Sequence, residues 1–274
     1  MPATSGKSSI FWTVVAIVYA IVILFPVLWM ASMMFKPAVA MFARPTEFFF
    51  TPTLGNFDYV ISEGFYWNLL TSVVLCTVST LLLVVIGTPA AYAFARFEMK
   101  AKDDLFLFVL ATRMGPPVCL VIPLYLIYAK IGLLDTYLGL TLAYMTFNLS
   151  FYVWVLRSFC RDLPVELEEA AALEGWSRLQ IFMRVVFPLL RNGIVATGVL
   201  CFIFAWNEFL FAFMLGGDRV QTLPVVIPKL ITAQGVRWGE VSVVGVAALV
   251  PVLTVVILLQ KNIVRGLTLG AVKG

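Results

Sequence analysis

Long apolar segments without charges constrain this chain more than any other feature of its sequence. The first of them, residues 10–35, contains no charged side chain. A helix needs about 20 apolar residues to cross the roughly 30 Å hydrocarbon core of a bilayer, and this run is long enough. Several similar segments follow, and the composition of 62% hydrophobic and 12% charged residues is far from that of a soluble domain. We therefore predict an all-α integral membrane protein.

Six transmembrane helices are expected. They are predicted at residues 10–35, within 68–94, and at 105–128, 138–156, about 194–215 and 241–259. The third span is interrupted by Arg113 and by the prolines at 116, 117 and 123. Residues 36–66 are polar and rich in proline, and we expect an exposed loop with a partial helix there. The chain is accordingly divided into residues 1–65 (tail, first span and outer loop), a transmembrane core at 66–260 and a tail at 261–274.

Basic residues predict how the spans are oriented. Twelve of the 19 Lys and Arg residues flank the spans on one side and six on the other, while Arg113 lies within a span. Because the cytoplasmic side of a membrane protein carries the excess of Lys and Arg, both termini and residues 161–191 are predicted to be cytoplasmic.

Residues 161–191 form the one long polar interruption, and their pattern predicts a helix, a glycine turn and a second helix. Pro164 fits a first turn, and Glu166, Glu168 and Glu169 follow near the positive end of the helix dipole. Gly175 is predicted to end this helix, and Pro188 to mark the limit of the next. Ser177 and Gln180 have the spacing of a capping box. Leu179, Phe182, Met183 and Val186 are expected to form one apolar stripe, while Ala170, Ala171 and Ala172 would leave a surface that another protein can approach closely.

Several kinds of chemistry are excluded by the residue inventory. The chain has no histidine, which removes imidazole bases, Ser-His triads and His-metal sites together. Its four cysteines are far apart, so neither a zinc spacing nor a disulfide framework is visible. The basic residues form no stripe for nucleic acid. We expect no cofactor, no metal, no nucleic-acid partner and no catalysis by this chain.

Four polar residues within the predicted spans are candidates for a transport pathway. Arg113 either lines a cavity or a subunit interface, or it reaches back to the cytoplasmic headgroups. Asn207 and Glu208 are expected in the middle of the fifth span, and Asn148 within the fourth. Each of these three either lines the pathway or forms a hydrogen bond that holds the bundle together.

The polar segment resembles the cytoplasmic coupling loop of ABC importer permeases. The family pattern is E-A-A, a glycine after three further residues, nine more residues and then I-x-L-P. This sequence matches it with Glu169, Ala170, Ala171, Gly175, Val185, Phe187 and Pro188. It departs from the pattern by Val185 for Ile, by Phe187 for Leu, and by E-G-W at 174–176 where D-G-A is usual. The resemblance implies that Glu166, Glu169, Ala170, Ala171, Gly175 and Pro188 belong to a contact with an ATPase.

Further motifs narrow the resemblance to permeases of the maltose-transporter type. They are FPVLWMASMMFKP at 25–37, LLDTYLGL at 133–140, AWNEFLFA at 205–212 and GLTLGAVKG at 266–274. The resemblance implies the type I ABC importer transmembrane fold and import of a sugar or polyol across the bacterial cytoplasmic membrane. It also implies a second homologous permease, two cytoplasmic ABC ATPases and an extracytoplasmic solute-binding protein as partners, with membrane lipid around the spans.

Two other classes of protein remain as alternatives. An ion-gradient-driven secondary transporter predicts paired carboxylates within the spans or broken helices at matching positions in two halves, and only Glu208 stands clearly within a predicted span. A membrane-embedded enzyme is disfavoured by the absence of histidine and by the lack of a cluster of Asp and Glu facing the membrane surface.

Overall fold

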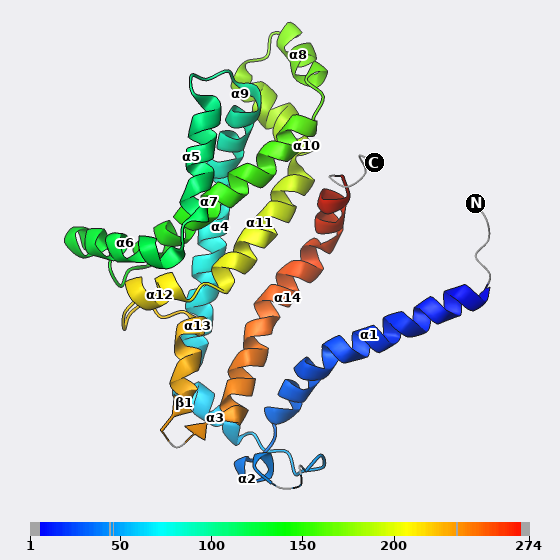
Figure 1. The fold of residues 1–274 in the computed structure, drawn as a ribbon, viewed down its shortest axis with the longest axis vertical. Coiled ribbons are helices and arrows are strands. Elements are labelled where there is room, and N and C mark those ends of the chain that lie inside the picture. The colour runs from blue at the N-terminus through cyan, green and yellow to red at the C-terminus, as the bar shows by residue number, and fades with distance from the viewer. Residues whose placement is uncertain (1–5, 44, 46, 234, 270–274) are drawn as a thin grey trace. The chain divides into compact units, whose positions relative to one another are not determined.

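The computed structural model describes residues 6–43, 45, 47–233 and 235–269. The regular elements among these residues are helices and one short hairpin, and the chain divides into two compact units. Unit 1 comprises the described residues up to Trp67 together with Val226–Val250, and unit 2 comprises Asn68–Val225 with the described residues after Val250. Figure 1 labels the elements.

Unit 1 contains the first apolar helix and the segments after it. Its elements are α1 (Gly6–Met33), α2 (Ala38–Met41), α3 (Gly55–Ser62), a 3₁₀ helix η2 (Ile227–Leu230), the strands β1 (Ile231–Thr232) and β2 (Gly235–Val236), and the first part of α14 (Trp238–Leu269). The strands pair antiparallel, with Ile231 opposite Val236. The predicted partial helix in the loop at 36–66 is therefore present as α2 and α3. The amide of Asn56 ties this loop to the end of α1 by donating to the carbonyl oxygens of Met34 (2.9 Å) and Lys36 (3.0 Å).

Unit 2 holds most of the helices. They are α4 (Phe65–Arg96, of which the first three residues belong to unit 1), α5 (Lys102–Met114), α6 (Pro117–Ile131), α7 (Tyr137–Asp162), α8 (Glu166–Leu173), α9 (Arg178–Ile181), the π-helix η1 (Phe182–Val186), α10 (Phe187–Leu189), α11 (Arg191–Trp206), α12 (Leu210–Leu215), and the C-terminal part of α14. The short α13 (Leu223–Val226) crosses the boundary between the units.

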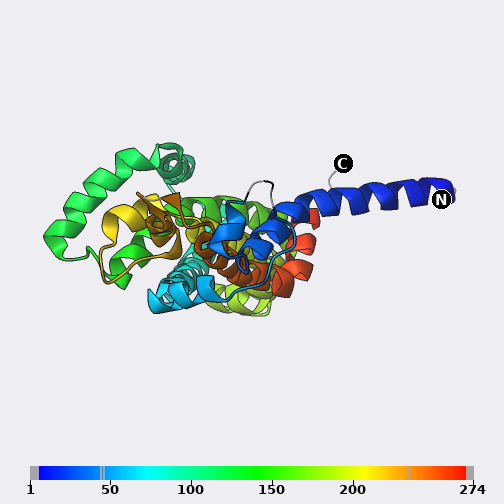
Figure 2. The ribbon, with the colours of Figure 1, turned by 90° about the horizontal axis from the view of Figure 1, so that it is seen from below.

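Within unit 2, α7 packs against α5 on one side and α11 on the other, and α12 packs against α6 and α7. Figures 1 and 2 show α6 leaving the direction of α5, with α12 beside it. α4 meets α7 at Gly87, where a Cβ atom would come within 2.5 Å of the Tyr152 ring. Next to this contact, the hydroxyls of Thr88 and Tyr152 form a hydrogen bond of 2.9 Å.

Four helices of the described chain are long and apolar enough to cross a membrane, or up to six spans result if each of two bent helix pairs counts as one. The four are Ile10–Met33, Phe65–Arg96, Tyr137–Asp162 and Trp238–Val264. The third predicted span is indeed broken, because α5 and α6 meet at 95°. Gly115 and Pro116 stand at this break and Pro117 begins α6, as expected from a proline that fits a first turn but not a helix interior.

The fifth predicted span differs from the expectation. It is not one helix over 194–215, because α11 ends at Trp206 and α12 begins at Leu210. At its other end α11 is bent by 73° from Arg178–Leu189. Pro188 marks the bend before α11, but the apolar composition of the segment carried no signal for the break between α11 and α12.

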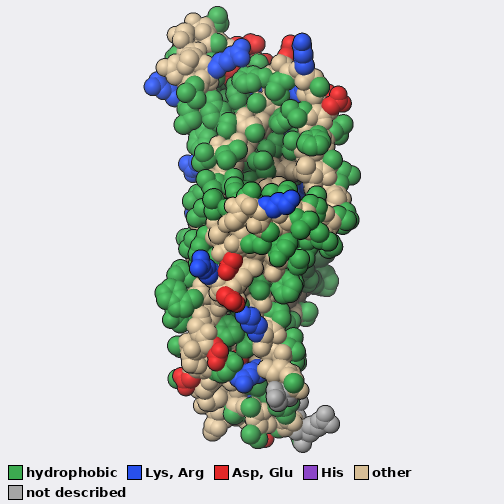
Figure 3. Space-filling view, turned by 90° about the vertical axis from the view of Figure 1, so that its left-hand side faces the viewer, with side chains coloured by type: hydrophobic (Ala, Val, Ile, Leu, Met, Phe, Trp, Pro, Cys, Tyr) green, Lys and Arg blue, Asp and Glu red, His purple; other side chains and the backbone are tan. Residues whose placement is uncertain are grey.

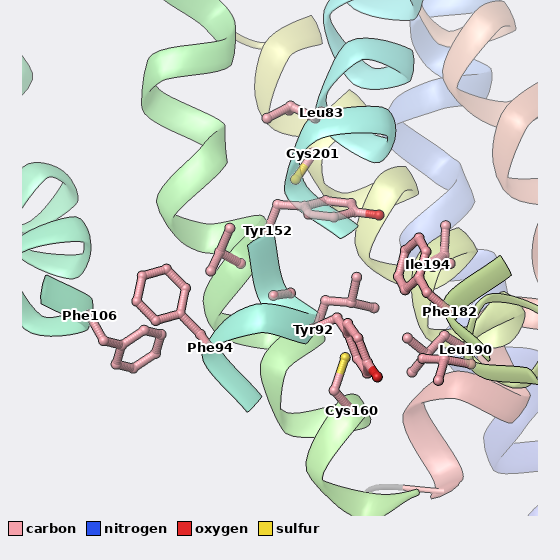
Figure 4. Packing of buried hydrophobic residues seen from close by; sticks show 14 of the residues in the cluster. Leu83, Tyr92, Phe94, Phe106, Tyr152, Cys160, Phe182, Leu190, Ile194 and Cys201 are labelled. Carbon is pink, nitrogen blue, oxygen red and sulfur yellow. The ribbon is translucent and has the colours of Figure 1, made fainter. Parts of the chain in front are cut away.

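The core of unit 2 lies between α4, α7, α11 and the segment after α8. Figure 4 shows it, with Tyr92 beside Cys160 and with Phe94 facing Phe106. Phe182, Leu190 and Ile194 belong to the same cluster. The loop at 161–191 is therefore packed against the bundle by an apolar contact of its own, so the bundle determines where the loop lies.

Candidate functional site: the helical loop and the cavity in the bundle

The helical loop, residues 161–191, forms the helix, glycine turn and helix that its sequence predicts. Gly175 has a φ of +86°, a conformation that residues other than glycine rarely adopt. The Trp176 amide donates to the Ala171 carbonyl at 3.2 Å, and the Gly175 amide to the Ala172 carbonyl at 3.0 Å. These two bonds make a Schellman motif at the C-terminus of α8, so the prediction that Gly175 ends the first helix is confirmed.

The second helix begins with the predicted capping box. The Gln180 amide donates to Ser177 Oγ at 3.4 Å, and the Ser177 amide donates to Gln180 Oε1 at 2.8 Å. The helix then continues through the π-helical turn η1 into α10. Pro188 lies inside α10, one residue before its end at Leu189, rather than beyond it. It is tolerated there because it occupies the first turn of the α-helical segment that follows η1.

The predicted single apolar stripe is wrong for this second helix. Phe182 and Val186 are buried, whereas Leu179 is 70% and Met183 is 53% exposed. Residues four apart share a helix face, so 179 with 183 and 182 with 186 lie on two adjoining faces whose directions differ by about 60°. The first of these faces is free in this chain, and the second joins the core.

α8 likewise has an inner and an outer face. Ala171 is buried in the core, while Glu166, Glu169, Ala170 and Ala172 are exposed. Leu173 is 91% exposed. The expectation of a side-chain-poor surface therefore applies to Ala170 and Ala172 but not to Ala171, which is used within the chain.

Glu168 differs from its acidic neighbours, which sequence reasoning grouped with it. Its carboxylate accepts hydrogen bonds from Tyr92 Oη at 2.6 Å and from Arg96 Nε at 2.7 Å. It points into the bundle and is not offered to a partner. The three-residue spacing from Glu168 to Ala171 along α8 could have indicated that both face inward. Because Glu168 stands between two other glutamates, at 166 and 169, nothing in the sequence separated it from them.

Charged side chains gather at the end of unit 2 that carries α8, and the face beneath it is mainly hydrophobic over α5 and α6 (Figure 3). This arrangement fits a polar loop at one end of membrane-embedded helices.

A cavity of about 200 Å³ lies within unit 2, between α5, α6, α7, α11 and α12. It brings together three of the four predicted pathway residues, namely Arg113, Asn148 and Glu208. The other lining residues are mainly aromatic: Pro117, Tyr144, Phe147, Phe204, Ala205 and Phe211.

Arg113 faces the protein. It lies in the last turn of α5, eleven residues after Lys102 and thus about 16 Å along the helix from its start. Its Nη1 donates to the Phe147 carbonyl at 3.0 Å and to Asn148 Oδ1 at 3.4 Å. The guanidinium also lies over the ring of Phe204, 4.8 Å from its centroid. Of the two interpretations left open by the sequence, these contacts favour a side chain that lines the cavity.

Asn207 and Glu208 do not lie in the middle of a helix, which corrects the expectation from sequence. They occupy the break between α11 and α12. The Asn207 amide donates to the Ile203 carbonyl at 2.8 Å, at the end of α11, and this side chain is exposed outside the cavity. Glu208 Oε1 accepts from the Phe211 amide at 3.0 Å, and its carbonyl accepts from Tyr144 Oη at 3.4 Å. The Glu208 side chain thus satisfies a backbone amide in the first turn of α12. The Ile203 carbonyl also accepts from the backbone amide of Asn207 at 3.1 Å, so the Asn207 side chain adds a second bond at the end of α11.

The described residues contain no group of three or more His, Cys, Asp or Glu side chains that could hold a metal ion.

A bundle of membrane-spanning helices with a polar cavity inside and a packed helical loop at one end describes a membrane transport subunit. Residues 84–269 match the family described as the binding-protein-dependent transport system inner membrane component, and the chain belongs to this family. It is a multi-pass inner-membrane permease of an ABC importer, a transport component that is not itself the ATPase. A transporter of this kind works with a solute-binding protein and an ATPase.

Individual proteins resemble the chain over almost all of its length. It is 35% identical to the trehalose/maltose transport system permease protein MalG of Thermococcus litoralis, over 94% of this chain and 95% of that one. It is 34% identical to the trehalose transport system permease protein SugB of Mycobacterium tuberculosis, over 98% and 99%. Among solved structures, a bacterial ABC transporter involved in the import of the acidic polysaccharide alginate matches with a TM-score of 0.74 at 23% identity, over 95% of this chain and 99% of that one. The last match shows the shared fold.

Proposed function

We propose that the chain is one transmembrane subunit of an ATP-driven importer that carries a sugar or polyol across the bacterial cytoplasmic membrane. The support for this solute class is that two relatives are named for trehalose/maltose and trehalose transport. The fold is also shared with a transporter of a polysaccharide. The family membership favours this class over an ion-gradient-driven transporter.

The proposed coupling rests on one observation: the helical loop has one face packed against the bundle and one face exposed. Its inner face is fixed to the bundle by Ala171 and Phe182, both in the core. Its outer face offers Glu166 and Glu169 beside the small Ala170 and the exposed Leu173. A partner with a basic, partly apolar cleft could therefore hold α8 firmly, and movement of that partner would act on the bundle.

The remaining partners follow from the same proposal. A second, homologous permease would complete the pathway, two ATPases would contact the two coupling loops, and an extracytoplasmic binding protein would deliver the solute. Both termini and the helical loop would face the cytoplasm. In support, Asn262 of α14 donates to Asn192 Oδ1 at 3.0 Å, so the last part of α14 lies beside the end of the helical loop. Residues 270–274 of the C-terminal motif lie outside the described residues.

The cavity is proposed to be part of the solute pathway. Arg113 and Asn148 offer hydrogen-bond donors, Glu208 offers acceptors, and aromatic rings of Phe147 and Phe204 surround them. Polar groups that converge among aromatic walls are the usual features of a site for a small polar molecule.

The test is purification of the tagged chain in mild detergent from its native membrane, followed by assay of ATP hydrolysis and identification of the recovered subunits by mass spectrometry. Wild type is compared with Glu169→Lys and with Glu63→Lys, a control that makes the same charge change at an exposed position outside the helical loop. We expect wild type and the control to recover a second permease and an ATPase with measurable hydrolysis. Glu169→Lys should recover the second permease but little ATPase.

Two results would argue against the proposal in different ways. Equal recovery of the ATPase with Glu169→Lys would remove Glu169 from the coupling contact. Recovery of the chain without any ATPase, in wild type as well, would contradict the proposed ATP-driven complex.

A further inference from the structure

Three residues join the helical loop to the end of α4, and none of them lies on the exposed face of α8. They are Tyr92, Arg96 and Glu168, which we call the clamp. Both oxygens of the Glu168 carboxylate are occupied, Oε2 by the Tyr92 hydroxyl at 2.6 Å and Oε1 by Arg96 Nε at 2.7 Å. The Arg96 and Glu168 side chains are each only 13% exposed. An ion pair so shielded from water is screened less than a surface pair and is held in one geometry.

Arg96 also holds the chain that leads into α8. Its Nη2 donates to the Leu163 carbonyl at 2.6 Å, while its Nε bonds Glu168 within the first turn of the helix. One planar guanidinium therefore fixes two points of the loop on either side of the start of α8. A lysine could not reproduce this, because its single ammonium lacks the fork geometry.

Tyr92 extends the contact to the second helix of the loop. Its ring centroid lies 5.3 Å from that of Phe182 in η1, and its hydroxyl bonds Glu168 in α8. The same side chain therefore touches both arms of the helical loop. Moving α8 without moving the end of α4 would break two charge-assisted hydrogen bonds and this ring contact.

α4 is suited to carry such a movement through unit 2. It is one continuous helix of 32 residues, about 48 Å long at 1.5 Å per residue. Midway it packs on Tyr152 of α7 through Gly87. Towards its other end Ser72 Oγ accepts a hydrogen bond from the Leu223 amide at 2.7 Å. Its C-terminus, which follows Pro89 inside the helix, is held by the clamp, so displacement of the loop acts on the end of α4 and through it on α7 at Gly87.

We propose that the clamp makes α8 and the end of α4 move as one body, so that displacement of the loop by an ATPase reopens or closes the cavity. Tyr92, Arg96 and Glu168 are then positioning residues for transport. They are not part of the surface that the ATPase binds. This inference rests on the proposed function. It assigns a role to the three clamp residues, which do not belong to the exposed face of α8 that is proposed to contact the ATPase. It predicts a specific defect, in which the ATPase still binds and hydrolyses ATP but the cavity no longer responds.

The experiment uses the complete complex purified with its ATPase and reconstituted into lipid vesicles. Cys119, the one exposed cysteine among the described residues, is replaced by Ser, and Phe204→Cys places a thiol in the cavity lining. The probe is the membrane-impermeant reagent 2-sulfonatoethyl methanethiosulfonate, whose labelling rate at position 204 is measured with and without ATP. The variants are Arg96→Gln, Glu168→Gln and Arg96→Lys, with Lys100→Gln as the control for loss of a nearby exposed charge.

In wild type and in Lys100→Gln, ATP should change the labelling rate by about tenfold, as a shift in the population of the state in which position 204 is accessible. In Arg96→Gln and Glu168→Gln the change should fall below about twofold, while the amount of bound ATPase and its hydrolysis rate persist. Arg96→Lys should restore part of the response. A variant that had merely unfolded would lose the ATPase as well, and partial rescue by lysine would not occur.

Two outcomes would overturn the clamp inference alone, and a third would overturn the proposed function together with it. If Arg96→Gln keeps the full ATP-dependent change in labelling, α8 and α4 are not linked by the clamp. If both Arg96→Gln and Glu168→Gln lose the ATPase but still recover the second permease, the subunit is folded and the clamp shapes the binding surface without transmitting movement. If wild type recovers no ATPase, or its labelling does not respond to ATP, the proposed function fails and the clamp inference fails with it.

Discussion

At the contact between α4 and α7, the structure predicts whether adding a single methyl group stabilises or destabilises the protein. Gly87 faces the ring of Tyr152, and an added Cβ would lie 2.5 Å from Cδ1 and 3.0 Å from Cε1 of that ring. Tyr152 cannot easily retreat, because it is completely buried and its hydroxyl is bonded to Thr88. Gly87→Ala should therefore separate the two helices locally or force Tyr152 from its rotamer.

Two opposing effects decide the magnitude. Replacing a glycine by alanine in a helix interior gains about 0.5–1 kcal/mol of helix stability. Inserting a methyl group into a packed core costs about 1–3 kcal/mol. Because the contact at 2.5 Å is with a fixed ring, the cost should prevail, and we expect a net destabilisation of about 1–2 kcal/mol. For a chain of this size that corresponds to a midpoint lower by about 2–8 °C.

The buried cysteines provide the assay. Cys76, Cys160 and Cys201 are buried, so a fluorogenic maleimide reacts with them only as the helices separate on heating. The exposed Cys119 is replaced by Ser in every variant to remove the background. The matched control is Gly198→Ala in α11, where the added Cβ would meet only methyl groups of Thr80 and Val84 at 3.9 Å.

Gly198→Ala should leave the melting temperature unchanged or raise it, since it gains helix propensity without a clash. Combining Gly87→Ala with Tyr152→Leu should remove the penalty of the alanine, so the two substitutions should be non-additive. The reasoning is refuted if Gly87→Ala melts at the same temperature as Gly198→Ala, or if its effect is undiminished when Tyr152 is absent.

Two further predictions concern the sites. At Gly175 an added Cβ would meet nothing within 4 Å, so only the backbone at φ +86° opposes substitution; Gly175→Val should reduce ATPase recovery severalfold more than Gly175→Asn, which tolerates this conformation better. A result in which both variants recover equal amounts would remove backbone strain as the cause. For the cavity, Arg113→Gln should abolish ATP-dependent uptake of whichever sugar the wild-type vesicles accumulate, with subunit recovery unchanged, because the donors to Phe147 and Asn148 are lost. Undiminished uptake would exclude Arg113 from the pathway.

The helical loop was predictable from sequence because its signals are local. Gly175 can be recognised as a helix terminus, and Ser177 with Gln180 as a capping box, from residues only a few positions apart. Which face of each helix turns inward was not predictable, because that depends on the side chains of the bundle that the loop packs against. Glu168 is drawn inward by Tyr92 and Arg96, which lie more than seventy residues earlier in the chain.

The apolar segments predicted helices in the membrane but not how they are bent. Prolines signalled the break between α5 and α6, since proline disfavours a helical conformation in the residue before it. No such residue marks the break between α11 and α12. Asn207 and Glu208 are compatible with either a helix or a break, and their interactions with the Ile203 carbonyl and the Phe211 amide settle the local structure.

The two breaks and the cavity belong to one feature. Each break in a membrane-embedded helix frees backbone groups that lipid cannot satisfy, so breaks are stable only where protein or a polar cavity surrounds them. Pro117 begins the helix after the first break, and Glu208 lies in the second; both line the cavity. Arg113 lies in the last turn of the helix before the first break and donates to the Phe147 carbonyl across the same space. The bends that hydropathy could not predict therefore border the space that we propose as part of the solute pathway.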